Sequence, residues 1–333
     1  MKFSRIVTAI DTHSSGEATR IIVGGLPKIP GGSMTEKQAY FQKHFDHLRK
    51  TLLQEPRGFA GLLGAVITEP TVSEADVGVI YLWTGGYFSA CGDSTYSTSA
   101  MLVNSGMVEV KEPITQITLD TVAGLVKTKV KVRDQEAEDI AMQGTPSFYL
   151  KTVKTDVPSV GEVEADIAYG GLWYAFIDAK KMGFTPTTEN KDEWIKLGWK
   201  IREFLAKRFP VDHPEYPELD TLDLVTFYTK PTNPESDAKH ANIFGPQQTC
   251  RSPAGTATNA RMAALYGKGE LRLGEEFVAE SIIGTLHKGR ILEETNIGRY
   301  KGILPEVSAS AYITGIQQYV IDPRDPLKDG FLL

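Results

Sequence analysis

Two short stretches of the chain contain residue types that can remove a proton from carbon. One runs from Cys91 to Thr95 with the sequence Cys-Gly-Asp-Ser-Thr, and it precedes a segment rich in alanine, methionine and leucine. The other runs from Cys250 to Thr256, contains the second cysteine of the chain and precedes a similar segment. A thiolate is the reactive form of cysteine, and it forms most readily at the start of a helix or beside a positive charge. These two stretches are therefore the candidates for an active site.

The two stretches occupy corresponding positions in a weak internal repeat. When Cys91 is placed over Ala254, the next glycine and a later threonine coincide, and Gly106 falls on Gly269. A glycine at such a position is a typical C-terminal helix cap. The repeat therefore predicts two domains of like fold, each of which directs the start of one central helix toward a shared cleft.

A pair of helix starts suits the chemistry of a carboxylate substrate. Each start offers unpaired N–H groups and roughly half a positive charge, which bind a carboxylate and stabilise the charge that develops when the α-proton leaves. Cys91 is the predicted base, with a pKa below the roughly 8.5 of a free thiol. Substrate contacts are expected from Gly92, Asp93, Gly255 and Thr256. The alternative interpretation of Cys91 is a small buried hydrophobic residue at a helix start.

Hydrophobic periodicity predicts the elements that position these motifs. Strands are expected over residues 5–10, 77–83 and 126–132, and helices over residues 35–53 and around residues 194–205. Strands surround few helices in both halves of the chain. This favours an α+β fold in which helices pack into mainly antiparallel sheets.

The length of the chain indicates two domains. Its 333 residues are about twice the usual size of one domain. We expect an N-terminal lobe over residues 1–152 that carries the Cys91 motif, and a C-terminal lobe over residues 153–311 that carries the second motif. Residues 312–333 are expected to return to the N-terminal lobe.

Charge and composition exclude several classes of function. The net charge is −6 and no block of like charges occurs, so no basic surface for nucleic acid or an anionic membrane is expected. No apolar run approaches the roughly 18–20 residues that cross a bilayer, and the N-terminus lacks the apolar stretch of about 7–15 residues that a secretory signal needs. Two cysteines are too few for a disulfide framework or a zinc site. A cytoplasmic protein with reduced thiols and no metal is therefore expected.

Motifs spread over nearly the whole chain resemble those of the proline racemase family. The stretch from Ile10 to Arg20 resembles the opening I-D-x-H-T-x-G-E-P-T-R, and the Cys91 motif stands where the family has M-C-G-H-x-T. The second motif, Cys250-Arg-Ser-Pro-Ala-Gly-Thr256, is similar to D-R-S-P-C-G-T. Further similarities lie at residues 55–58 (E-P-R-G), 119–124 (L-D-T-P-A-G), 146–148 (P-S-F) and 321–331.

The resemblance implies a diaminopimelate-epimerase-like fold. Two pseudo-symmetric lobes would each wrap a central helix, and the active site would lie in the cleft between them. It also implies a small imino acid substrate, no cofactor (neither pyridoxal phosphate nor metal), and a homodimer. Racemases and epimerases of the family use two cysteines, one on each face of the α-carbon, and one removes the proton that the other returns.

The chain departs from this pattern at three functional positions. Ala254 stands where the family has its second catalytic cysteine, Asp93 replaces a histidine, and Cys250 replaces an aspartate that contacts the substrate amino group. Asp93 is interpreted either as a partner of the substrate ammonium or as a helix cap. Cys250 is interpreted either as a relocated second acid or as a passive thiol.

These departures favour one activity and leave two others open. An alanine carries no proton, so the arrangement fits best the trans-3-hydroxy-L-proline dehydratases of the family, which keep only the first cysteine. The typical threonine of those dehydratases is also missing at position 254. The first alternative is a proline or 4-hydroxyproline racemase or epimerase with a different second acid. The second alternative is an inactive protein that binds an imino acid.

Overall fold

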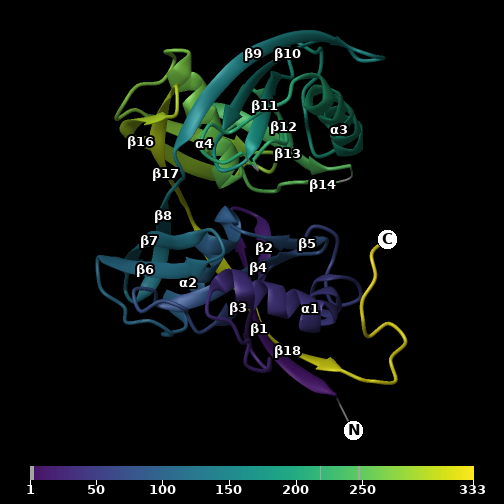
Figure 1. Cartoon of the computed structure of the whole chain (residues 1–333), viewed down its shortest axis with the longest axis vertical. Coiled ribbons are helices and arrows are strands. Elements are labelled where there is room, and N and C mark those ends of the chain that lie inside the picture. The colour runs from purple at the N-terminus through teal and green to yellow at the C-terminus, as the bar shows by residue number, and fades with distance from the viewer. Residues whose placement is uncertain (1–3, 218, 247) are drawn as a thin grey trace. The chain divides into compact units, whose positions relative to one another are not determined.

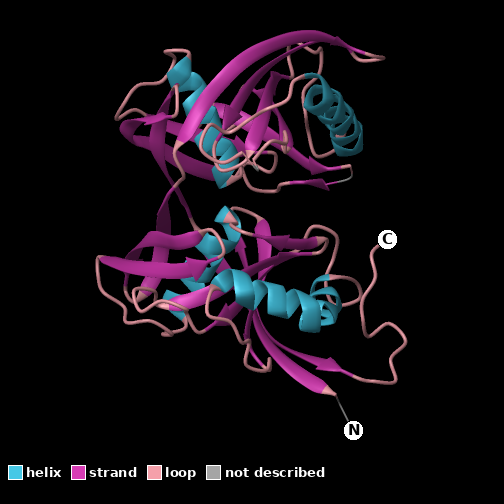
Figure 2. Ribbon diagram, in the orientation of Figure 1, coloured by secondary structure: helices cyan, strands magenta, loops and turns pink. Residues whose placement is uncertain are grey.

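In the computed structural model the chain forms two compact units, and strands predominate in both (Figures 1 and 2). The structure describes residues 4–217, 219–246 and 248–333. Unit 1 comprises Met1–Met142 and Ser310–Leu333, and unit 2 comprises Gln143–Ala309. The boundary expected at residue 152 falls inside a strand that pairs within unit 2, so the division lies about ten residues earlier.

Among the described residues, unit 1 contains two helices and nine strands. The helices are α1 (Met34–Leu53) and α2 (Gly92–Asn104). The strands are β1 (Arg5–Ser14), β2 (Glu17–Gly24), β3 (Leu63–Thr68), β4 (Val77–Trp83), β5 (Gly86–Phe88), β6 (Ile114–Thr121), β7 (Gly124–Arg133), β8 (Glu136–Gln143) and β18 (Ala311–Ile321).

Unit 2 repeats this pattern of helices and strands. Its helices are α3 (Lys191–Arg208) and α4 (Gly255–Gly267). Its strands are β9 (Ser147–Val157), β10 (Gly161–Tyr169), β11 (Trp173–Asp178), β12 (Leu224–Thr229), β13 (Ala238–Gly245), β14 (Gln248–Thr249), β15 (Glu276–Ser281), β16 (Leu286–Ile297) and β17 (Tyr300–Ala309).

The strands of the two units pair in the same way. In unit 1, β18, β1, β2, β3, β4, β6, β7 and β8 lie in that order, and only the β2–β3 and β4–β6 pairs are parallel. In unit 2, the order is β9, β10, β11, β12, β13, β15, β16 and β17, with parallel β11–β12 and β13–β15 pairs. The expectation of mainly antiparallel sheets is confirmed. Strand β18 occupies the same position in unit 1 that β9 occupies in unit 2.

Helices α2 and α4 are the central elements of their units. Nearly every residue of α2 is buried, and so are most residues of α4. A helix that is buried on all sides must be surrounded by other elements, and strands surround both helices in Figure 1. The β10–β11 turn packs so closely on α4 that position 170 requires glycine. A Cβ at Gly170 would lie 2.3 Å from the Ala260 backbone nitrogen.

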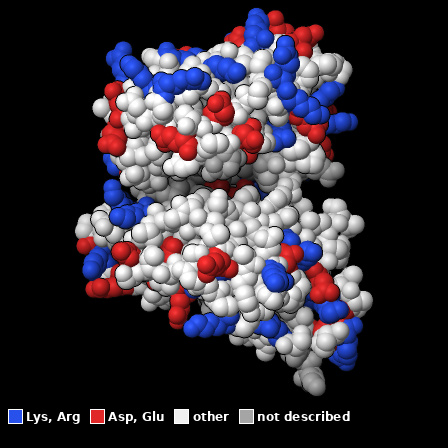
Figure 3. Space-filling view, viewed as in Figure 1, with Lys and Arg blue, Asp and Glu red and all other residues white. Residues whose placement is uncertain are grey.

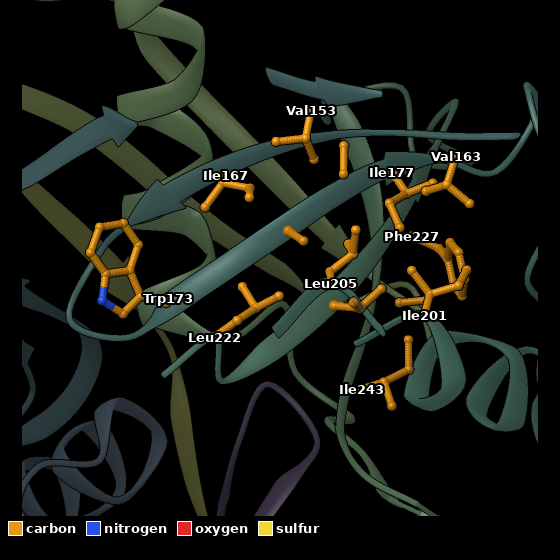
Figure 4. Close-up of a cluster of buried hydrophobic side chains, with 14 of the residues drawn as sticks. Val153, Val163, Ile167, Trp173, Ile177, Ile201, Leu205, Leu222, Phe227 and Ile243 are labelled. Carbon is orange, nitrogen blue, oxygen red and sulfur yellow. The ribbon is translucent and has the colours of Figure 1, made fainter. Parts of the chain in front are cut away.

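The peripheral helices α1 and α3 are amphipathic and cover a hydrophobic core. Helix α1 begins at Ser33, whose side chain caps the Glu36 N–H, and buries Phe41 and Leu52. Helix α3 buries Ile201 and Leu205 against strands β10 to β13 (Figure 4). Apolar burial on this scale contributes most of the stability of each unit.

Two features of the surface bear on the partners of the chain. Acidic and basic side chains are mixed on the face that Figure 3 shows, and no continuous basic area occurs there. Strand β18 pairs with β1, and no partner of its other edge occurs among the described residues. Residues 311–321 contain no charged side chain, and Ile316 is 74% exposed.

Candidate active site

Cys91 is the residue at which the central helix of unit 1 begins. Its backbone is extended (φ −149°, ψ 113°) and it occupies the N-cap position of α2. The Thr95 hydroxyl donates to the Cys91 carbonyl at 2.8 Å and lies 2.6 Å from the Tyr81 hydroxyl. Because Tyr81 and Thr95 are both buried, these two bonds fix the backbone at the start of the helix. The expectation that Cys91 lies at a helix N-terminus is confirmed.

Ala254 is the corresponding residue in unit 2, at the N-cap position of α4. The Thr258 hydroxyl donates to the Ala254 carbonyl at 2.9 Å, as Thr95 does to Cys91. The Ala254 backbone differs, with φ +61° and ψ 121°. An alanine in this region is strained by about 1–3 kcal/mol, and such strain is typical of functional sites.

The first turns of the two helices supply backbone N–H groups with no partner inside the helix. In α2 these groups belong to Gly92 and Asp93, and in α4 they belong to Gly255 and Thr256. The Thr256 hydroxyl lies 2.7 Å from the Tyr174 hydroxyl, which holds its side chain in place. Free N–H groups of this kind can bind an anionic group. The substrate contacts expected from these four residues remain a prediction.

The pKa of Cys91 corrects a prediction made from the sequence. The residue is partly exposed, but its sulfur is desolvated, and this burial raises the pKa of the thiol to about 12. The carboxylates of Asp93 and Glu17 raise the pKa further, whereas hydrogen bonds from Ser94 lower it. The predicted decrease below the pKa of a free thiol was wrong, because desolvation and two nearby carboxylates outweigh the helix start.

Asp93 lies in the first turn of α2 and is only 7% exposed. The N-cap position belongs to Cys91, which makes no well-formed capping hydrogen bond, so the interpretation of Asp93 as the helix cap was wrong. A carboxylate in a first helical turn is stabilised by the helix dipole. The same carboxylate raises the pKa of Cys91, which shows that it acts on the sulfur.

Cys250 lies on a loop that the backbone and side chain of the buried Asn242 in β13 hold in place. The Asn242 carbonyl accepts hydrogen bonds from the Cys250 N–H at 3.1 Å and from the Thr249 hydroxyl at 2.7 Å. The Asn242 amide nitrogen donates to the Pro253 carbonyl at 2.8 Å. Cys250 packs against the apolar cluster that contains Ala254, so this thiol belongs to the neighbourhood of the α4 start.

Comparisons with known proteins identify the family of the chain. The sequence model of the family described as Proline racemase matches residues 9–332. The chain belongs to the proline racemase family. It is 44% identical to a proline racemase from Acetoanaerobium sticklandii, with 99% of each chain covered. It is 35% identical to a trans-3-hydroxy-L-proline dehydratase from Burkholderia ambifaria, with 100% of each covered.

Solved structures of the proline racemase family share its fold. A hydroxyproline epimerase from Agrobacterium vitis, with bound trans-4-hydroxy-L-proline, matches with a TM-score of 0.88 and 29% identity over 100% of this chain and 96% of that one. The family thus contains racemases, epimerases and a dehydratase, all of them enzymes.

Several residues of the family motifs have structural roles here. Arg20 forms an ion pair with both oxygens of Asp11, at 2.8 and 2.9 Å, and packs on the Tyr319 ring. The His13 Nδ1 accepts the Gly16 N–H at 3.2 Å, so His13 stabilises the turn between β1 and β2. These contacts stabilise the β1–β2 hairpin that carries the motif.

The aromatic residues around the Cys91 motif belong mostly to the core. Tyr96 is fully buried, and the Tyr87 hydroxyl donates to Asp46 at 2.9 Å. Phe88 stacks on Trp83 with ring centroids 5.7 Å apart and remains half-buried.

Sequence analysis missed Asn242 and a pair of buried carboxylates. Asp120 accepts hydrogen bonds from the Thr71 N–H and hydroxyl, both at 2.6 Å. In unit 2, burial alone would raise the pKa of Glu280, but hydrogen bonds from Asn233, Thr232 and Lys239 lower it to about 2. The repeated motif Pro-Thr-x-x-Glu-x-Asp, at residues 70–76 and 231–237, indicates this shared structure.

Neither a metal-binding cluster nor a membrane-spanning helix occurs in the described part of the chain. Residues 4–217, 219–246 and 248–333 contain no group of three or more His, Cys, Asp or Glu placed to hold a metal ion. Within the same ranges, no helix has the length and apolar character needed to cross a membrane.

Proposed function

We propose that this member of the proline racemase family removes the α-proton of a small imino acid with Cys91 as the base. The leading reaction is loss of water from trans-3-hydroxy-L-proline. The observation that carries the proposal is the asymmetry of the two helix starts, since a thiol lies at the start of α2 and a methyl group at the start of α4. One base suffices for elimination, whereas inversion needs a second acid on the opposite face.

The substrate carboxylate would bind to the helix starts through backbone N–H groups. Those of Gly92 and Asp93 come from α2, and those of Gly255 and Thr256 come from α4. The same donors stabilise the aci-carboxylate, because negative charge develops on these oxygens as the α-proton leaves. Action of both helix starts on one substrate is a prediction that comes from the family resemblance.

The proposed elimination balances without a cofactor. The Cys91 thiolate takes the α-proton, and the electrons of the Cα–H bond form a double bond between C2 and C3. The bond from C3 to the hydroxyl oxygen breaks, and the departing hydroxide takes up a proton and leaves as water. The resulting enamine then gains a proton at C3 and loses the proton of its nitrogen, which gives a cyclic imine with its double bond between C2 and nitrogen.

The raised pKa of Cys91 suits this task once substrate is bound. A thiolate whose conjugate acid has a pKa of about 12 is a stronger base than an ordinary thiolate, but it is rarely formed in the empty site. The cationic imino group of the substrate would pair with Asp93, whose carboxylate raises the pKa of Cys91. Such pairing would offset this negative charge and lower the pKa of the thiol.

A second candidate function is racemisation or epimerisation at the α-carbon of proline or 4-hydroxyproline. The observation that favours it is the position of Cys250, which packs against the cluster that includes Ala254. A second thiol in this neighbourhood could return the proton from the other face. The 44% identity to a proline racemase favours the same function.

One set of incubations distinguishes these functions. The protein is incubated in deuterated water with L-proline, D-proline, both 4-hydroxyprolines and trans-3-hydroxy-L-proline, and NMR and chiral chromatography follow the products. Elimination gives the cyclic imine from the 3-hydroxy substrate, whereas racemisation gives deuterated product of inverted configuration. The Cys91→Ser variant serves as the control and is expected to be inactive in every case. Efficient proline racemisation by the unmodified protein would refute the leading proposal and favour Cys250. Tight binding without any exchange would indicate an inactive binding protein.

A further inference from the structure

A buried asparagine holds the loop that leads into α4. Asn242 of β13 is fully buried, and so is Thr226, which lies opposite it on β12. The Asn242 amide nitrogen donates to the Pro253 carbonyl at 2.8 Å, and its amide oxygen accepts the Thr226 hydroxyl at 2.6 Å. Because a carbonyl can only accept, the group that faces Pro253 must be the amide nitrogen. The direction of both hydrogen bonds is therefore defined.

The peptide between Pro253 and Ala254 is held at both of its polar ends. Asn242 binds the Pro253 carbonyl, and the Ser252 hydroxyl accepts the Ala254 N–H at 3.1 Å. This peptide leads directly into the Ala254 backbone at φ +61°, a region that favours glycine. Strain of this kind persists only where the surrounding structure fixes the backbone. The two hydrogen bonds supply such a fixation.

The same strand position holds the helix start in unit 1. When the two copies of the Pro-Thr-x-x-Glu-x-Asp motif are superposed, Asn242 falls on Tyr81. Each of these residues is in the strand that follows its copy of the motif, β13 or β4. The Tyr81 hydroxyl lies 2.6 Å from that of Thr95, which donates to the Cys91 carbonyl at 2.8 Å. Each unit therefore uses a polar side chain at this position to hold the backbone where its central helix begins.

We propose that Asn242 is a positioning residue, which holds Ala254 in its strained conformation and thereby sets the direction of the Gly255 and Thr256 N–H groups. The Thr226 hydroxyl keeps the Asn242 amide in the required orientation. The helix itself leaves the two N–H groups unpaired, and they are the groups proposed to bind the substrate carboxylate. The catalytic meaning of this role rests on the proposed function, whereas the hold on Ala254 does not.

A double-mutant cycle in urea tests the hold on Ala254 without any turnover. Glycine adopts φ +61° without strain, so Ala254→Gly should raise the urea midpoint of the unmodified protein. In the Asn242→Ala background an alanine at position 254 can relax, and the same glycine should leave the midpoint unchanged or lower it. Equal shifts in the two backgrounds, or no rise in the unmodified protein, would overturn the proposal.

The matched control for this cycle is Ile243→Val. Ile243 is the next residue of β13, and its side chain packs in the core that α3 covers (Figure 4). The substitution removes one buried methyl group and lowers the stability of unit 2, but it leaves the hydrogen bonds of Asn242 in place. Ala254→Gly should therefore raise the midpoint of Ile243→Val as much as that of the unmodified protein. Loss of the shift in this background would show that any weakening of unit 2 relaxes Ala254, which would contradict a specific role of Asn242.

Thr226 supplies a milder pair of variants. Thr226→Val keeps the branched shape of the side chain but removes the hydroxyl, whereas Thr226→Ser keeps the hydroxyl. Amide hydrogen exchange of residues 249–256, followed by mass spectrometry, should be about tenfold faster in Thr226→Val, because the Asn242 amide loses its fixed orientation. It should stay close to the unmodified rate in Thr226→Ser, and the peptide that contains Cys91 in unit 1 is the internal reference. An unchanged rate in Thr226→Val, or equal rates in the two variants, would refute the proposed role.

Turnover separates this role from the proposed function. If the protein turns over no imino acid, the proposed function fails, whereas the urea cycle and the exchange rates still decide the role of Asn242. If turnover occurs, Thr226→Val should raise KM and lower kcat, because the donors of the α4 start bind the carboxylate before and during proton removal. Thr226→Ser should recover most of both constants. A value of kcat/KM in Thr226→Val that equals that of the unmodified protein would exclude a positioning role in the reaction.

Discussion

Mild acid should destabilise unit 2 through two buried histidines. His240 of β13 and His287 of β16 are at most 1% exposed, and burial lowers the pKa of each to about 3. The positive charge of Arg261 lowers the pKa of His240 further. In the unfolded chain each imidazole should titrate near its ordinary pKa of about 6.5. Below this pH the unfolded state therefore binds more protons than the folded state does. The free energy of unfolding consequently falls as the pH falls.

The size of the effect follows from these values. At about pH 5 an unfolded histidine is mostly protonated and a native one with a pKa of about 3 is neutral, which costs about 2 kcal/mol for each residue. The two together cost about 4 kcal/mol relative to about pH 8. This is a large part of the roughly 5–15 kcal/mol that stabilises a typical protein. The loss at pH 5 depends mainly on the unfolded pKa, so a native pKa of 4 would change it little.

Urea unfolding between about pH 8 and pH 5 measures this loss. Trp173 and Trp194, both buried in unit 2, report the transition by fluorescence. The variant His240→Phe keeps a ring between Phe176 and Phe277, whose centroids lie 6.1 Å from that of His240. It should lose about 2 kcal/mol less than the unmodified protein over this range.

The control and the pH window make the test decisive. His44→Gln, which changes an exposed histidine of unit 1, serves as the control. Carboxylates with lowered pKa, such as Glu280, lose their contribution only below about pH 4.5, outside the window. Parallel pH curves for His240→Phe and the unmodified protein would show that His240 is not held neutral, and the reasoning would fail.

Four further substitutions test the site and the surface. Cys91→Ser should abolish every activity. Ala254→Cys should introduce measurable proline racemisation, since a missing positioned acid costs about 10²–10⁴-fold in rate. Chiral chromatography measures both effects. Ala254→Gly should raise the free energy of unfolding by about 1 kcal/mol, because relief of the backbone strain at φ +61° exceeds the entropy cost of glycine. An unchanged urea midpoint would contradict this prediction. The family resemblance predicts a homodimer, and Ile316→Lys on the uncharged strand β18 should make the protein monomeric in analytical ultracentrifugation. The stability of the monomer should change by no more than about 0.5 kcal/mol.

Much of the local structure could be predicted from the sequence. The helix expected over residues 35–53 is α1 (Met34–Leu53), and the strand expected over residues 77–83 is β4. Apolar periodicity and capping residues determine these elements locally. The strand expected over residues 5–10 extends to Ser14, because pairing with β18 and β2 continues through a bulge after Asp11.

The site was only partly predictable. Short motifs indicate which residues begin α2 and α4, since small residues and a closing glycine are local features. The pKa of Cys91 depends on Glu17, which is distant in sequence, and on desolvation by the folded unit. The role of Asn242 likewise depends on the loop at residues 249–253 lying against β13. No periodicity in the chain encodes such contacts.

The return of β18 to unit 1 has a consequence for synthesis on the ribosome. Unit 2 is continuous, from Gln143 to Ala309, and its strands β9 to β17 can complete their pairing as soon as they emerge. Unit 1 is translated first but lacks β18 until residues 311–321 are made, which leaves the edge of β1 unpaired. An open edge of this kind can pair with other chains. The nascent chain therefore carries an unfinished first domain while the inserted second domain folds, which reverses the usual order in which domains mature.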